Sequence, residues 1–178
     1  AACLVSLSTA CAATEPAADA GPSASVDVPS PCDGLLEIGL CRLADGGGPC
    51  RGALDAPTEF VAVPDPATVS IVLGEQGSWM IGLAARTRGI APGDPERPSD
   101  TDNPALEVRV VDAAGVLVAV YRGRVAFVPD ASDPTLLVCS AIDVVTDVVL
   151  GGTLAVVATV RDHGGVTHCG RLALTIAP

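Results

Sequence analysis

Apolar and polar residues alternate with a period of two along much of the chain from Thr58 onward. The pattern is clearest in residues 153–161 and 171–176, which flank a turn containing Gly164 and Gly165. A period of two puts one set of side chains on each face of a β-strand, and the glycines allow a tight reversal. This segment is therefore predicted to be a β-hairpin with one apolar face. Its apolar positions are Leu154, Val156, Ala158, Val160, Leu172, Leu174 and Ile176.

Shorter runs of the same kind precede this hairpin. Turn residues separate them, and residues 90–104, with four prolines, form a long predicted loop. About seven or eight short strands with regularly spaced turns are typical of an antiparallel β-sandwich of immunoglobulin-like type. The earlier runs lie at 60–63, 69–73, 79–85, 106–110, 116–120 and 136–144.

Two short motifs within these runs suggest a family. The turn at residues 160–165 reads Val-Arg-Asp-His-Gly-Gly, and residues 71–79 read Ile-Val-Leu-Gly-Glu-Gln-Gly-Ser-Trp. The first resembles the last hairpin of bacterial immunoglobulin-like or fibronectin-like domains. The second resembles a Gly-x-Gln-Gly segment of secreted bacterial proteins, although it lacks the second Gly and the His expected after Gly77. The resemblance covers most of residues 58–178 and implies a sandwich without implying a reaction.

The beginning of the chain has the composition of an export signal followed by a tether. Residues 8–11, Ser-Thr-Ala-Cys, resemble the lipobox of bacterial lipoproteins, with Leu7 one place earlier than usual. We therefore expect residues 1–11 to be a residual signal peptide ending at a lipidated Cys11. The Pro-, Ala- and Ser-rich residues 12–31 are expected to form a disordered linker. The predicted location is the cell envelope, as an outer-membrane lipoprotein or a periplasmic or extracellular protein.

The cysteines between the linker and the sandwich are evenly spaced at Cys32, Cys41 and Cys50. No Cys-x-x-Cys pair accompanies them, so a zinc ribbon is disfavoured and a disulfide between two of the three is predicted. Residues 32–57 are therefore interpreted as a cysteine-containing loop segment. Alternation along the strands also places Cys139 and Cys169 on faces away from their apolar neighbours, which predicts a Cys139–Cys169 disulfide.

Charge and composition narrow the classes of function. The formal net charge of −11 disfavours a sequence-independent nucleic-acid binder, which needs a basic face. Apolar residues make up 49 % of the chain but aromatic residues only 2 %, so Val, Leu, Ile and Ala must build the core. No apolar run approaches the roughly 20 residues of a membrane-spanning helix.

The predicted loop at 90–104 contains candidate calcium ligands. They are Asp94, Glu96, Asp100, Asp102 and Asn103, whose oxygen atoms are of the type that calcium prefers. Their spacing is not that of an EF-hand, and a solvated loop is the alternative interpretation.

Two other groups of polar residues are weaker candidates. His163, His168, Cys169 and Met80 are the residue types of a copper site in a β-sandwich, but their order along the chain disfavours copper. The three arginines at 109, 122 and 124 are candidates for an anion patch, with surface ion pairs to nearby carboxylates as the favoured alternative.

No catalytic motif is present. The chain contains no Gly-x-Ser-x-Gly elbow, His-Glu-x-x-His motif, P-loop or dinucleotide fingerprint. The leading prediction is a non-enzymatic binding or structural module at the cell envelope that uses no cofactor. Its partner would be a protein or glycan, and it would contact a membrane only through a lipid anchor. A metal-binding extracytoplasmic domain is the alternative, and an enzyme comes third.

Overall fold

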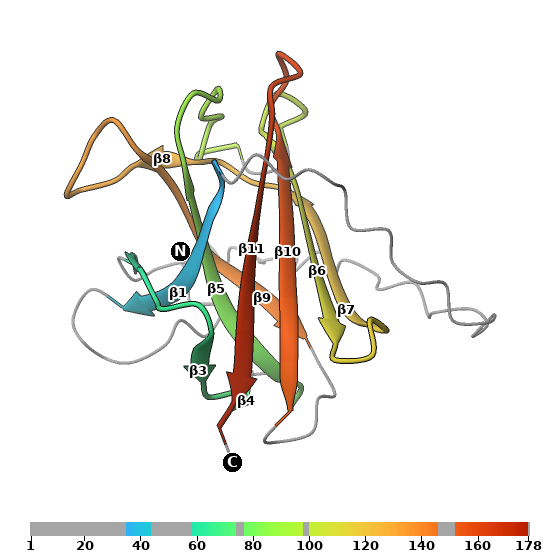
Figure 1. Cartoon of the computed structure of the whole chain (residues 1–178). Helices are drawn as coiled ribbons and strands as arrows, with labels where there is room; N and C mark the ends of the chain where they lie inside the picture. Colours follow the sequence, from blue (N-terminus) through green and yellow to red (C-terminus); the bar gives the residue numbers. More distant parts are fainter. Residues whose placement is uncertain (1–34, 44–57, 74–76, 98–99, 146–151, 178) are drawn as a thin grey trace, which may run out of the picture.

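The computed structural model describes residues 35–43, 58–73, 77–97, 100–145 and 152–177. These residues form two β-sheets that pack face to face (Figure 1). No element in the described ranges is a helix, so none is a helix long and apolar enough to span a membrane. The fold is therefore an all-β sandwich, as the alternating pattern predicts.

Some predicted features lie outside the described residues. They are the signal remnant at 1–11 with its lipobox-like Cys11, the linker at 12–31, Cys32 and Cys50. Export and lipidation therefore stay predictions.

The first sheet contains six strands, five of which lie in the order β2-β1-β5-β9-β8, while β4 pairs with β5. The second sheet contains five strands in the order β3-β11-β10-β6-β7. The strands of the first sheet are β1 (Glu37–Leu43), β2 (Thr58–Val61), β4 (Val72–Leu73), β5 (Trp79–Thr87), β8 (Val128–Pro129) and β9 (Leu137–Val145). Those of the second are β3 (Ala67–Val69), β6 (Ala105–Asp112), β7 (Leu117–Arg124), β10 (Thr153–Arg161) and β11 (Thr167–Ile176).

This strand order is that of an immunoglobulin-like sandwich. One sheet of such a domain contains strands A, B, E and D, and the other contains G, F, C and, in variable-type domains, C′. Here β1, β5, β9 and β8 take the first set of places, and β11, β10, β6 and β7 take the second. Two details differ from the prediction. The described residues contain eleven strands, several of them too short to show alternation, and β3 runs parallel to β11.

The core between the sheets consists almost entirely of aliphatic side chains. All seven apolar positions predicted for the final hairpin belong to it, which confirms that prediction. Phe127, only 1 % exposed, is the one buried aromatic residue among those described.

The sandwich begins earlier than residue 58. The predicted loop segment 32–57 contains strand β1, which pairs with both β2 and β5. Ile38 of this strand belongs to the core, as does Leu36, the residue just before the strand. The amide of Leu36 also donates a 3.3 Å hydrogen bond to the carbonyl oxygen of Cys169, so this segment reaches the second sheet. The interpretation of this part as a loop was wrong, because the cysteines and glycines around it obscured a short strand.

The predicted Cys139–Cys169 disulfide is also wrong. Cys139 is a buried thiol that lies in the core rather than on the outer face, and it forms no disulfide. The register explains the error, because Leu83 pairs with Ile142 while Ala85 pairs with Cys139. One extra residue in β9 forms a β-bulge there, and it reverses the alternation between Ile142 and Cys139. Burial raises the pKa of the Cys139 thiol to about 12.

Cys41 takes part in a disulfide, and so does Cys169. Cys169 lies outside the core cluster that contains Leu172 and Leu174, so its predicted face is confirmed. Cys41 packs with Ala84 in a small separate cluster. Since Cys139 is a thiol, it is not the disulfide partner of either cysteine.

Candidate binding groove on the five-stranded sheet

The outer face of the five-stranded sheet presents apolar side chains on its edge strand β7. Leu117, Val118 and Val120 are 43 %, 37 % and 45 % exposed. Ala119 and Tyr121 of the same strand pack against the core instead. The run at 116–120 therefore lies largely on a strand, as predicted, but its valines face outward. Leu117, Val118 and Val120 thus form an exposed apolar strip on this edge strand.

Arginines share this outer face with the valines. The register of β7, β6 and β10 arranges its residues in rows that cross the strands, with neighbouring strands about 4.8 Å apart. From β7 to β10 these rows are Arg124–Ala105–Arg161, Arg122–Glu107–Thr159 and Val120–Arg109–Val157.

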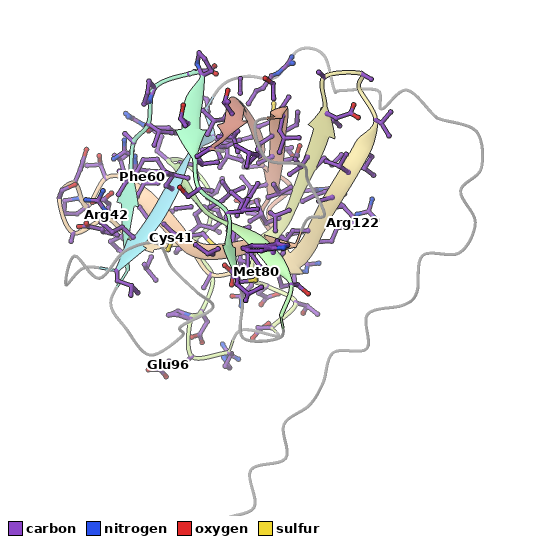
Figure 2. All side chains as sticks on the ribbon, turned by 90° about the horizontal axis from the view of Figure 1, so that it is seen from below. Cys41, Arg42, Phe60, Met80, Glu96 and Arg122 are labelled. Atoms are coloured by element: carbon purple, nitrogen blue, oxygen red, sulfur yellow. The ribbon has the colours of Figure 1, made fainter. Side chains whose placement is uncertain are left out.

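A groove of about 400 Å³ lies over these rows. We call it the arginine groove. Its charged residues are three arginines and one glutamate, which gives a formal charge of +2 within a chain of net charge −11. Figure 2 shows Arg122 on the outer side of the sandwich, on the opposite side of the molecule from Arg42. The groove is lined by Ala105, Leu106, Glu107, Arg109, Arg122, Gly123, Val157, Thr159 and Arg161.

Glu107 lies at the centre of the charged residues. One of its carboxylate oxygens accepts a hydrogen bond from Nε of Arg109, and the other accepts one from Nε of Arg122 at 2.9 Å. Burial alone would raise the pKa of Glu107, but the two arginine hydrogen bonds outweigh it and lower the pKa below its usual value. Glu107 is therefore ionised at neutral pH and holds both guanidinium groups.

The remaining donors of the groove are available to a ligand. Within the described residues, the Nη groups of Arg109 and Arg122 make no hydrogen bond, and Arg161 makes neither a hydrogen bond nor an ion pair. Arg124 differs, because its Nη1 donates a 2.8 Å hydrogen bond to the carbonyl oxygen of Asn103. The predicted surface ion pairs are thus present for Arg109 and Arg122. The anion patch stays a prediction.

The same face continues past the arginine groove toward the other end of the sheet. Arg171 on β11 lies opposite Val157 and extends the third row. Beyond it is a second hollow of about 340 Å³, lined in part by Val111, Ala155, Arg171 and Ala173. The whole face therefore combines arginines with small or aliphatic side chains.

The candidate calcium ligands are not gathered into a site. Asp94 and Asp100 both form ion pairs with Arg97, at 2.7 and 3.0 Å. The hydrogen bond from Arg97 is the largest cause that lowers the pKa of Asp94. Asn103 is fully buried, and its Nδ2 donates to the carbonyl oxygen of Arg97. In the described part of the chain, no group of three or more His, Cys, Asp or Glu residues is placed to hold a metal ion.

The residues considered for copper lie on different elements. His163 is exposed in the β10–β11 turn and His168 lies half-buried on β11. Met80 belongs to β5 in the other sheet, and Cys169 is disulfide-bonded. This arrangement gives no support to a copper site.

Sequence reasoning did not single out two members of the groove, Glu107 and Arg161. A signal for Glu107 was present, because residues 107 and 109 share one face of a strand. For Arg161 the only signal in the sequence was its position among the residues that alternate with the apolar set of the hairpin. Its approach to the other arginines depends on the pairing of β10 with β6, which alternation does not specify.

No protein-family model, curated protein or solved structure matches the chain.

Proposed function

We propose that the protein is an exported, non-enzymatic binding module of the cell envelope, anchored through lipid on Cys11. Its binding surface is the outer face of the five-stranded sheet. The partner is a protein or glycan of that compartment, and it presents negative charge to the arginine groove.

The observation that carries this proposal is the separation of charge over the surface. Arg109, Arg122 and Arg161 line one groove with a single glutamate in a strongly acidic chain, near exposed Val118 and Val120. Arginine beside exposed apolar side chains is a composition favoured in protein binding sites. The like charge of this face disfavours its contact with the same face of a second copy, which favours a different, acidic partner.

Charge reversal on the groove tests this function. We expect the full chain, purified without lipid, to co-sediment with envelope fractions from the cells that produce it, and to do so less at higher salt. Loss of two charge-assisted contacts in the Arg122→Glu/Arg161→Glu variant should weaken this association more than about tenfold.

Arg42→Glu is the matched control, because Arg42 is exposed on β1 of the other sheet. This variant should sediment like the unmodified protein. Equal sedimentation of the groove variant and the unmodified protein, with both folded by circular dichroism, would remove this face as the binding surface.

A further inference from the structure

The arginine groove has the size and chemistry of a site for a small anion. Its volume of about 400 Å³ lies within the range of small-ligand pockets, about 300–1,000 Å³. Its floor includes Ala105 and Val157, which offer apolar contact, while Arg122 and Arg161 approach from different strands. A ligand that fits has an apolar or neutral frame and more than one negative group.

Glu107 orients two of the arginines toward such a ligand. It occupies Nε of Arg109 and Nε of Arg122, which leaves the two terminal nitrogens of each guanidinium for another acceptor. This pair of donors matches the two oxygens of a carboxylate or phosphate group. Glu107 is thus a positioning residue that acts through Arg109 and Arg122.

The charge of the chain limits the size of the ligand. At about 0.1 M salt, charges further than about 10 Å apart are largely screened from one another. A long polyanion that extends beyond the groove meets a chain of net charge −11, whereas a compact anion stays beside the arginines. The negative Glu107 also disfavours a single dense dianion such as phosphate, compared with separate carboxylates that each face an arginine.

We propose that the arginine groove binds a compact organic polycarboxylate, with separate carboxylates on the arginines and the carbon frame over Ala105 and Val157. This inference goes beyond the proposed function, because it gives the arginine groove a small-molecule ligand in addition to a protein or glycan partner, and it rests on that function only in using the same groove. Arg161 lines the groove and has no carboxylate partner within the described residues. A substitution of Arg161 therefore tests ligand binding without breaking an internal ion pair.

Citrate is the probe for this inference. Calorimetric titration of the full chain at neutral pH and about 0.1 M salt should show saturable binding with one site. Acetate, with a single carboxylate, and inorganic phosphate should bind at least about tenfold more weakly. Arg161→Gln should weaken citrate binding about tenfold, and Arg42→Gln should leave it unchanged.

Glu107→Gln separates orientation from charge. The substitution raises the formal charge of the groove from +2 to +3, so charge alone predicts tighter citrate binding. Loss of orientation predicts the opposite, and we expect citrate to bind about fivefold more weakly. Tighter binding in Glu107→Gln would overturn the role of Glu107 as a positioning residue.

Three results would overturn the ligand assignment: no saturable citrate binding, equal affinity for phosphate and citrate, or no effect of Arg161→Gln. If citrate fails while envelope association still depends on Arg122 and Arg161, the polycarboxylate assignment falls and the proposed function stands. If neither depends on these arginines, both fall.

Discussion

At the scale of single residues, Asp162 shows how a side chain can join distant loops. Its Oδ2 accepts a hydrogen bond from the amide of Ala91 at 2.9 Å, and its Oδ1 accepts one from the amide of Val166 at 2.8 Å. One carboxylate thus closes the β10–β11 turn and ties it to the loop that follows β5. The hydrogen bond from Ala91 is the largest cause that lowers the pKa of Asp162.

We predict that Asp162→Asn destabilises the protein by about 1–2 kcal/mol at neutral pH, because an amide has one acceptor oxygen for two amide donors. A carboxyl group with a lowered pKa stabilises the fold above its ordinary pKa, about 4, and this contribution is lost as the pH falls through the lowered pKa. The difference between variant and wild type in denaturant unfolding should therefore shrink below about pH 4. A difference that stays constant between neutral and acidic pH would contradict this role.

Arg86 illustrates a second residue-scale device, on the opposite sheet. Its guanidinium lies 4.3 Å from the centre of the Phe60 ring and forms a two-point contact with Glu37 through Nε and Nη2. Arg86 thus uses its Nε and Nη2 donors within the chain. Arg109 and Arg122 of the arginine groove use only Nε in this way and keep their Nη donors.

At the scale of elements, the docking of the segment before β1 depends on Gly170. A Cβ atom added at Gly170 would lie 1.8 Å from the carbonyl oxygen of Leu36, which is a backbone atom and cannot move alone. The glycine therefore permits the close crossing of two strands rather than a turn. It allows Leu36 to enter the core and hydrogen-bond with β11.

We predict that Gly170→Ala destabilises the protein by about 3 kcal/mol or more, because it forces the segment before β1 away from β11. Gly164→Ala is the control, since its nearest contact would be a side-chain oxygen of Asp162 at 3.3 Å. Thermal and denaturant unfolding measure both variants. Similar losses for the two substitutions would show that the close crossing is not the cause.

Strand β7 explains, at the scale of elements, how the arginine groove is built. It is an edge strand whose outward side chains change from Val118 and Val120 to Arg122 and Arg124 along its length. Its partner β6 supplies Glu107 between these arginines and β10. The hairpin of β6 and β7 therefore builds the groove by pairing with β10, and no long loop in the described part of the chain contributes to the lining.

At the scale of the whole molecule, the arginines proposed to bind the partner lie on one sheet of an acidic chain, and the proposed lipid anchor is Cys11. An anchored module needs its lipid for location but not for folding, since the sandwich has a core of its own. The two properties can therefore be separated by substitution.

We predict that cells fed labelled palmitate incorporate the label into the protein, and that Cys11→Ala abolishes the label and moves the protein from the membrane to the soluble fraction. The purified variant should unfold at the same temperature as the unmodified chain. Retention of both label and membrane association in Cys11→Ala would show that this cysteine is not the anchor.

The sequence by itself determined the all-β class, the aliphatic core and the final hairpin. These follow from alternation, which acts between neighbours along a strand and is visible in the order of residues such as Leu154 and Val156. It also identified three of the arginines that lie on the outer face, although not which of them keep donors for a ligand.

Only the tertiary structure decided the orientation of Cys139 and the composition of the groove. One extra residue in β9 turns Cys139 into the core, and a bulge leaves little trace in an apolar sequence. Glu107 and Arg161 are 54 positions apart in the sequence, yet both line the groove because β10 pairs with β6. Pairing between distant strands is set by the packing of the whole sandwich, so the pattern along any one strand cannot specify it.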